Sequence, residues 1–207
     1  MKLVAAVLIT VGALSAAPIT GLYNTGSSVT GTTDNYWRII TPDGPAEVIL
    51  QSLYPGTWVP TSGTSGWVWR DNQGQPTGTG ANPLVYTFRY TFALDSNLDP
   101  NTVQIAGQWA TDNEGNDILV NGLSTGQSSP GYTSFTGFSL NSNFRAGNNT
   151  IDFVVTDWGN IGGFRLEWGS ATADLLISAP NTPVPEPSTT VLIALGLAGI
   201  AFGKLRS

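Results

Sequence analysis

The stretch LVYTFRYTFAL, residues 84–94, alternates large apolar side chains with small or polar ones. Successive side chains of a β-strand point to opposite faces, so this alternation predicts a strand with one buried face. That face would carry Tyr86, Phe88, Tyr90, Phe92 and Leu94. We therefore expect a strand whose aromatic side lines a core.

The same alternation recurs on both sides of this stretch. Longer segments that show it are TVQIAGQWA (102–110), NTIDFVVTDW (149–158) and GGFRLEW (162–168). Shorter candidates are NYWRII (35–40), AEVILQSLY (46–54), GWVWR (66–70), DILVNG (117–122), FTGFSL (135–140) and ADLLIS (173–178). About ten strands joined by Gly-, Asn- and Pro-rich turns predict an antiparallel sandwich or barrel. The turn-rich residues 70–83 are expected to form a loop.

A resemblance narrows the fold class. The residues that carry this resemblance lie within residues 118–157 and are Asn121-Gly122, Gly126, Gly131-Tyr132, Phe135, and Gly147 with Asn149. This order resembles the galactose-binding-like jelly-roll modules attached to β-galactosidase-type glycosidases. It implies an all-β fold, an antiparallel jelly-roll β-sandwich, which we place at residues 18–179. Residues 22–177 also resemble a body that recurs ahead of the sorting tails described below. Both resemblances concern the fold and imply no activity.

The N-terminal sequence MKLVAAVLITVGALSAA, residues 1–17, has the three parts of a secretory signal peptide. Lys2 is followed by an apolar run and then by small residues of the kind that signal peptidase accepts. Cleavage after Ser15 is favoured over cleavage after Ala17, because the second cut would leave Pro18 directly behind it. A retained anchor or a buried helix is the alternative, although the run is short for a membrane span.

The C-terminal end predicts a short membrane helix. Residues 189–203 carry no charge, and as a helix they would be about 22 Å long, against a hydrocarbon core of roughly 30 Å. Lys204 and Arg206 favour a cytoplasmic end, with the body on the other side of the membrane. We therefore divide this end into a linker at 180–187, a transmembrane helix at 188–203 and a basic cytoplasmic tail at 204–207.

The start of this tail carries a recognisable motif, Val184, Pro185, Glu186, Pro187 and Ser188. Together with the apolar segment and the basic end, it resembles the PEP-CTERM sorting signal of Gram-negative bacteria, although the basic end is thin. The resemblance implies processing near Pro-Glu-Pro by an exosortase-type membrane peptidase. It also implies an exported protein, anchored in the inner membrane facing the periplasm and then released to the cell surface or extracellular matrix. An ordinary tail anchor is the alternative.

The same tail signature also carries the label "ice-binding protein C-terminal domain", which describes a tail and not an activity. Ice binding itself is not expected, because the sequence has no regular Thr-x-Thr array and no solenoid period.

Composition removes several classes of function. The chain has no Cys and no His, so disulfides, thiolate metal sites and a histidine general base are excluded. Apart from Lys2, Lys204 and Arg206, five basic residues stand against fourteen acidic ones, a formal charge of −9 (5 − 14). A phosphate polyanion would be repelled by this body, so nucleic-acid binding is not expected.

One acidic turn, TDNEGND, is a weak candidate for a structural calcium site. Asp112, Glu114, Asn116 and Asp117 could supply the oxygen ligands that calcium prefers. The turn does not fit an EF-hand loop, because the sixth position is not glycine and the twelfth is not glutamate. An acidic surface turn is the simpler interpretation, and no other cofactor is expected.

Tryptophans in Gly-, Ser- and Pro-rich surroundings are the candidate ligand-binding residues. Trp58, Trp67 and Trp69 lie in residues 54–70, and Trp158 lies in DWGN. Exposed aromatic rings on loops can stack on the apolar faces of sugars. We expect Trp58 to be exposed. For Trp67 and Trp69 the alternative is a place in the core.

These observations favour a non-enzymatic exported surface or extracellular-matrix protein that binds or associates with extracellular polysaccharide. A structural surface protein without a discrete ligand is the alternative. A glycoside hydrolase would need two facing carboxyl groups, whereas most acids here lie in turns that Asp and Asn stabilise, so no catalytic residue is predicted. The expected partners are signal peptidase, an exosortase-type peptidase, the membrane as a transient anchor, and polysaccharide.

Overall fold

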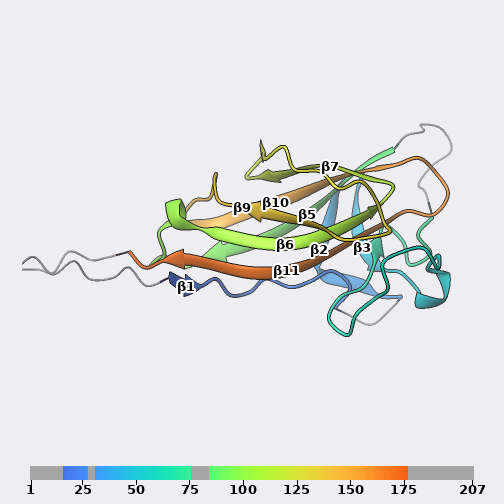
Figure 1. Cartoon of the computed structure of the whole chain (residues 1–207), viewed down its shortest axis with the longest axis horizontal. Helices are drawn as coiled ribbons and strands as arrows, with labels where there is room; N and C mark the ends of the chain where they lie inside the picture. Colours follow the sequence, from blue (N-terminus) through green and yellow to red (C-terminus); the bar gives the residue numbers. More distant parts are fainter. Residues whose placement is uncertain (1–15, 28–30, 76–83, 177–207) are drawn as a thin grey trace, which may run out of the picture. The chain divides into compact units, whose positions relative to one another are not determined.

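A computed structural model describes residues 16–27, 31–75 and 84–176, which fold almost entirely into β-structure (Figure 1). The strands are β1 (Ala16–Pro18), β2 (Thr33–Thr41), β3 (Asp43–Val48), β4 (Val68–Trp69), β5 (Leu84–Leu94), β6 (Gln104–Asp112), β7 (Glu114–Val120), β8 (Leu123–Ser124), β9 (Thr136–Leu140), β10 (Gly147–Asp157) and β11 (Gly163–Asp174). Two short 3-10 helices, η1 (Gln51–Leu53) and η2 (Pro100–Thr102), are the only helices in the described ranges. The all-β class is confirmed.

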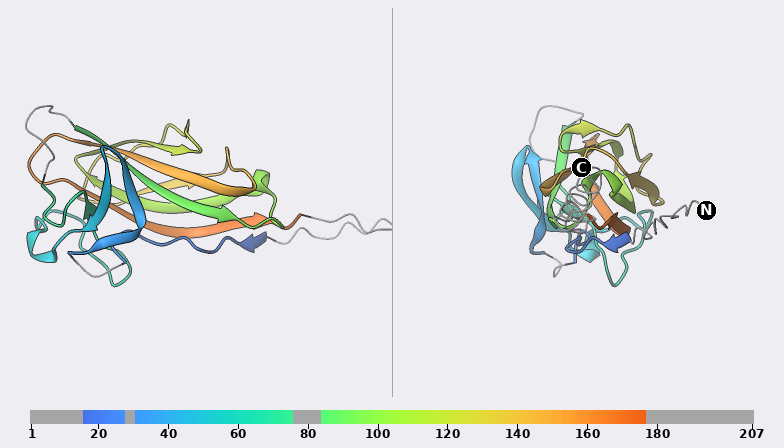
Figure 2. Two further views of the ribbon diagram at one scale, coloured as in Figure 1. Left: turned by 180° about the vertical axis from the view of Figure 1, so that it is seen from behind. Right: turned by 90° about the vertical axis from the view of Figure 1, so that its left-hand side faces the viewer.

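The strand order places the chain in two facing layers. One layer runs β8-β7-β10-β5-β2-β3, and the path continues through β4 into β11-β6-β9, with β1 beside β11. From β5 onward, most successive strands lie in opposite layers, because β5, β7 and β10 belong to the first layer and β6, β9 and β11 to the second. This alternation is the topology of a jelly roll, so the predicted sandwich is confirmed. Figure 2 shows the layers from two further sides.

Aromatic side chains fill the space between the layers. The ring of Phe153 in β10 lies 5.3 Å from that of Phe164 in β11 and 5.2 Å from that of Trp109 in β6. Phe88 of β5 stacks on Phe164 at 4.6 Å. All four side chains are fully buried. Such ring pairs contribute about 0.5–1.5 kcal/mol beyond the burial of their area, so they bind one layer to the other.

Strand β5 confirms the prediction made from residues 84–94. Its buried side chains are Tyr86, Phe88, Tyr90, Phe92 and Leu94. The strand pairs with β10 along its whole length, from Leu84↔Asp157 to Leu94↔Gly147, and with β2 on its other edge. One face meets the core, and both edges are hydrogen-bonded.

The turn between β7 and β8 is a hairpin formed by Asn121 and Gly122. Asn121 and Gly122 both have left-handed backbone, with φ of 51° and 82°. Val120 pairs with Leu123 across them, so the loop has two residues. Two successive positive φ values match the twist of the flanking strands, and Asn-Gly accepts that geometry more readily than other pairs.

Several strands differ from expectation. Strand β11 continues to Asp174, so Ala173 and Asp174 belong to it and do not begin a separate strand. A register shift between Trp168 and Ala171 interrupts the alternation without ending the pairing. Strand β3 ends at Val48, and η1 follows where a longer strand was expected. Strand β1 was not predicted, because two alanines and a proline carry little strand signal.

Most of the predicted terminal segments lie outside the described residues. These are residues 1–15 of the signal peptide, the linker at 180–187, the transmembrane helix at 188–203 and the tail at 204–207. In the ranges that are described, none of the helices is long and apolar enough to cross a membrane.

Candidate functional site

Residues 19–27 continue from β1 along the edge of β11. The amide of Ile19 donates to the carbonyl of Ala171 at 2.9 Å, and that of Thr25 to the carbonyl of Leu166 at 3.3 Å. Thr25 is fully buried, and its Oγ1 donates to the carbonyl of Gly66 (2.9 Å) and accepts from the amide of Leu166 (2.9 Å). The segment therefore acts as an irregular outer strand of the second layer. We call it the N-terminal segment.

Hydrogen bonds from the polar atoms of Tyr90, Trp37 and Trp168 hold the backbone of this segment in place. The hydroxyl of Tyr90 donates to the carbonyl of Gly21 at 2.6 Å and accepts from the amide of Tyr23 at 3.0 Å. Burial raises the pKa of Tyr90 to about 12, so its hydroxyl stays protonated and able to donate. The indole N–H groups of Trp37 and Trp168 both donate to the carbonyl of Tyr23, at 3.1 and 3.0 Å.

The ring of Tyr23 points outward and stacks on Tyr36 of β2. The two ring centroids are 3.9 Å apart with 14° between the planes, and the residues are 45% and 42% exposed. Buried Asp34 joins the two backbones, since its carboxylate accepts from the amides of Gly26 (2.8 Å) and Tyr36 (2.9 Å). Sequence reasoning missed both tyrosines. The one available signal was the Gly- and Asn-rich setting of Tyr23 in GLYNTG.

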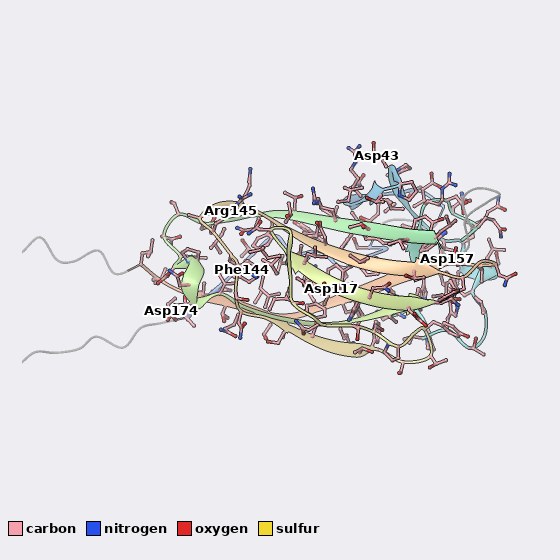
Figure 3. All side chains as sticks on the ribbon, turned by 90° about the horizontal axis from the view of Figure 1, so that it is seen from above. Asp43, Asp117, Phe144, Arg145, Asp157 and Asp174 are labelled. Carbon is pink, nitrogen blue, oxygen red and sulfur yellow. The ribbon has the colours of Figure 1, made fainter. Side chains whose placement is uncertain are left out.

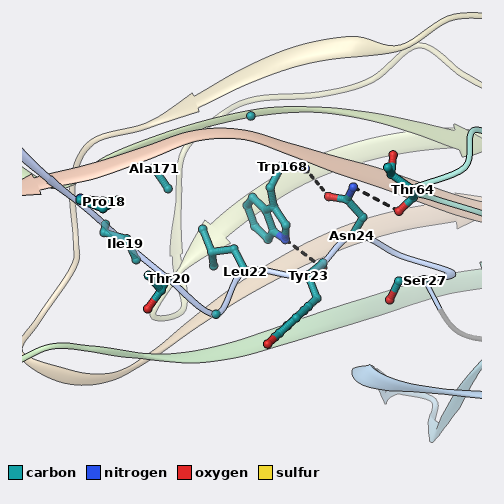
Figure 4. Close-up of a pocket in the computed structure, with 12 residues that line it drawn as sticks. Pro18, Ile19, Thr20, Leu22, Tyr23, Asn24, Ser27, Thr64, Trp168 and Ala171 are labelled. Atoms are coloured by element: carbon teal, nitrogen blue, oxygen red, sulfur yellow. Dashed lines mark hydrogen bonds between the residues drawn. The ribbon is translucent and has the colours of Figure 1, made fainter.

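A groove of about 580 Å³ lies beside Tyr23 (Figure 4). The N-terminal segment forms one wall, and Trp168, Gly169 and Ala171 of β11 line the other. Asn24 ties the walls together, because its Oδ1 accepts from the amide of Trp168 (2.8 Å) and its Nδ2 donates to the carbonyl of Thr64 (3.3 Å). None of the described residues that line the groove carries a charge. The site is thus rigid, neutral and of mixed polarity.

The expectation that Trp58 is exposed is wrong. It is only 4% exposed, its ring lies 4.3 Å from that of Trp67, and its Nε1 donates to Asp112 Oδ2 at 2.9 Å. Gly163 leaves room for both rings, since a Cβ there would lie 2.6 Å from Trp58. Trp67 and Trp69 are also fully buried, as the alternative interpretation held. None of these three rings offers a face to a ligand.

Buried Arg165 explains why the loop that carries Trp58 folds back. Its side chain is 1% exposed, and its guanidinium donates to the carbonyls of Val59 (3.1 Å) and Pro60. The same group donates to Ser65 Oγ (2.8 Å) and to Glu167 Oε1 (3.0 Å). Burial acts to raise the pKa of Glu167, but hydrogen bonds, that from Ser65 foremost, and the charge of Arg165 hold it below its usual value. The loop is therefore fastened to the outer side of β11.

Trp158 is the one predicted tryptophan that the structure leaves exposed, at 51%. Its amide donates to Asn113 Oδ1 at 2.7 Å, which fixes its backbone. It follows Asp157, which lies at the opposite end of the strands from Asp174 (Figure 3). Trp158 is not among the residues that line the groove beside Tyr23.

The four candidate calcium ligands have separate surroundings. Asp112 accepts from Trp58, Asn116 Oδ1 accepts from Thr156 Oγ1 (2.7 Å), and Glu114 is exposed. Asp117 Oδ1 accepts from the backbone amides of residues 118 (2.8 Å) and 126 (3.1 Å). Among the described residues no three acidic, His or Cys side chains are grouped as a metal site would require. Three of the four side chains thus accept hydrogen bonds from residues outside the turn.

Comparison with protein-family models identifies a PEP-CTERM protein-sorting motif at residues 183–206. The match confirms the sorting signal that was predicted from Val184 to Ser188 and the segment behind it, and it indicates an exported protein. The motif lies outside the described residues. Comparison with curated proteins gives no match.

Several solved structures are similar to this chain. A CBM35 from Paenibacillus barcinonensis has 18% identity and a TM-score of 0.33, over 60% of this chain and 88% of its own. A family 35 carbohydrate binding module from Clostridium thermocellum has 13% identity and a TM-score of 0.32, over 70% and 92%. A GH26-CBM35 β-(1,4)-mannanase from Podospora anserina has 13% identity and a TM-score of 0.33, over 75% and 32%. These similarities are too distant to assign a ligand to this chain.

Removal of the Tyr90 hydroxyl should loosen the N-terminal segment. Tyr90→Phe leaves the carbonyl of Gly21 and the amide of Tyr23 without their shared partner. The free energy of unfolding should fall by about 1–3 kcal/mol, and amide exchange at residues 21–23 should accelerate. Tyr36→Phe is the matched control, because no described contact involves the exposed Tyr36 hydroxyl. Equal behaviour of the two variants would contradict this account of the segment.

Stability should also depend on the protonation of Asp112. Burial raises its pKa from 3.8 to about 6, Trp58 opposes this, and the charge of Asp157 adds to it. Between these two pKa values, the Asp112 carboxyl group is protonated in the folded state and ionised in the unfolded chain. The free energy of unfolding should therefore fall as pH rises from about 4 to about 6, by at most about 3 kcal/mol.

Urea unfolding across this pH range measures the effect. Asp112→Asn should flatten the profile, since an amide oxygen can still accept the Trp58 N–H. Asp95→Asn, at an exposed position, should leave the profile unchanged. An unaltered slope in Asp112→Asn would refute the assignment.

Proposed function

We propose that this protein is an exported surface or matrix protein that binds carbohydrate in the groove beside Tyr23 and Tyr36. The observation that carries the proposal is the exposed, stacked tyrosine pair, fixed at one side of a neutral groove. A sugar has apolar C–H faces and a rim of hydroxyl groups. A flat aromatic surface suits the first, and the carbonyl, amide and hydroxyl groups of the groove suit the second.

The sorting motif and the charge of the body support a neutral polysaccharide as the ligand. A protein with this motif reaches the outside of the cell, where polysaccharide is available to it. Residues 18–179 hold five basic and thirteen acidic residues, a formal charge of −8 (5 − 13), which disfavours long anionic polymers. In this proposal signal peptidase removes the N-terminal peptide, and an exosortase-type peptidase releases the body from its transient membrane anchor. The protein acts by binding, without catalysis.

Trp158 is a second candidate platform for the same function. Its exposure supports it, although it does not line the groove beside Tyr23. A structural surface protein without a discrete ligand is the competing proposal. The variants below distinguish binding at the tyrosine pair, binding at Trp158, and a structural role without a ligand.

Truncation of the tyrosine pair should weaken binding. Screening on a glycan array and affinity electrophoresis would identify a retained polysaccharide. Tyr23→Ala and Tyr36→Ala should then each lower affinity by about tenfold, the loss expected when one aromatic contact is removed. Thermal stability should change little, because both rings are exposed.

Trp158→Ala is the matched control, since it removes an exposed aromatic ring elsewhere. A loss of binding in Trp158→Ala alone would move the site to that end of the strands. Absence of retention on every glycan would favour the structural protein.

The mature chain should begin at Ala16. Strand β1 starts there and pairs Ala16 with Asp174, whereas a cut after Ala17 would remove two of its three residues. Intact-mass analysis of the exported protein should show an N-terminus at Ala16 and loss of the residues beyond the Pro-Glu-Pro motif. A first residue of Pro18, or an uncut chain in the cytosol, would refute this part of the proposal.

A further inference from the structure

A second hollow, of about 300 Å³, adjoins the groove at Trp168 and Gly169, which line both. Strand β6 contributes Ala106, Gly107 and Gln108 to it, and β9 contributes Gly137. The two hollows meet where the register of β11 and β6 shifts, between Trp168 and Ala171. A path therefore leads from the N-terminal segment across β11 to β6 and β9.

Two glycines, Gly107 and Gly137, expose their backbone along this path. Gly107 pairs with Trp168 on one side and with Phe138 on the other, and Gly137 pairs with Gln108. A Cβ at Gly107 would lie 2.5 Å from the Phe138 ring, so the packing of Phe138 requires glycine there. Gly137 is exposed and has no such constraint, because its nearest neighbour, Gly107 O, would be 3.9 Å from a Cβ.

The chemistry of the second hollow resembles that of the groove. Among the described residues that line it, only Glu167 is charged, and Arg165 pairs with that carboxylate at 3.0 Å. Gln108 Nε2 donates to Glu167 Oε2 at 2.9 Å, which holds the amide in place. The surface thus offers fixed polar groups and bare backbone without a net charge, which suits the hydroxyl groups of a neutral polymer.

We infer that the site takes an extended neutral oligosaccharide, which lies from Tyr23 across Trp168 and Gly169 to Gly137, and that a single sugar fills only part of it. The inference rests on the proposed function. The N-terminal segment, β11, β6 and β9 are successive neighbours, so the path covers three inter-strand spacings, or roughly 14 Å. Affinity should therefore grow with chain length until the path is filled.

A side chain at Gly137 tests the far end of the path. Gly137→Leu places an isobutyl group over the second hollow, and the space around its Cβ allows the variant to fold. Ala93→Leu is the matched control, because it adds a comparable group at an exposed position on β5, in the other layer. Thermal melts of both variants should match that of the unmodified protein.

The probes are ladders of neutral oligosaccharides of increasing length, cello-, manno-, xylo- and galacto-series, from which the glycan array selects the series that is retained. In calorimetric titrations the longer members should bind the unmodified protein about tenfold more tightly than the shortest. Gly137→Leu should abolish this gain and leave the shortest member unaffected, whereas Ala93→Leu should keep the gain.

Equal affinity for short and long members, or a gain that survives in Gly137→Leu, would overturn the extended path while leaving the proposed function intact. The expected tenfold loss of affinity in Tyr23→Ala together with the expected Gly137→Leu result would support both. If no glycan is retained at all, the proposed function fails, and this inference fails with it.

Discussion

Two indole N–H groups that share one carbonyl oxygen, that of Tyr23, are the interaction on which the candidate site depends. Trp37 comes from the first layer and Trp168 from the second, and their rings stack at 6.1 Å with 17° between the planes. A carbonyl has two lone pairs, so both donors can be satisfied. The packing of the core therefore fixes where the N-terminal segment lies, and with it the direction of the Tyr23 ring.

A buried cation determines the role of the tryptophan-rich loop. An isolated guanidinium inside a protein would be costly, but Arg165 has two carbonyls, a hydroxyl and a carboxylate around it. Those partners come largely from the loop. The charge of Arg165 is therefore satisfied only when the loop is folded onto β11. Trp58 and Trp67 are buried as a result. The loop, which looks from its composition like a ligand surface, stabilises the fold instead.

The proposed binding site and the sorting motif belong to different parts of the chain. The groove and the second hollow belong to the sandwich, and the sorting motif belongs to residues 183–206. The motif indicates export but says nothing about a ligand. The proposal that this surface binds hydroxyl groups rests on the absence of net charge in both hollows, since Arg165 pairs with Glu167 within an otherwise acidic protein.

Local patterns in the sequence determined much of the architecture. The alternation at 84–94 located β5 and its buried face, and Val184 to Ser188 located the sorting motif. Local patterns could not show that Trp58 is buried, that Tyr23 and Tyr36 form an exposed stacked pair, or that β1 is a strand. Each depends on contacts between distant residues: Trp58 bonds Asp112, 54 positions away, and Tyr23 bonds Trp168, 145 positions away. Strand period and turn geometry are set by neighbours in the chain, whereas only the folded sandwich decides which aromatic ring remains in contact with water.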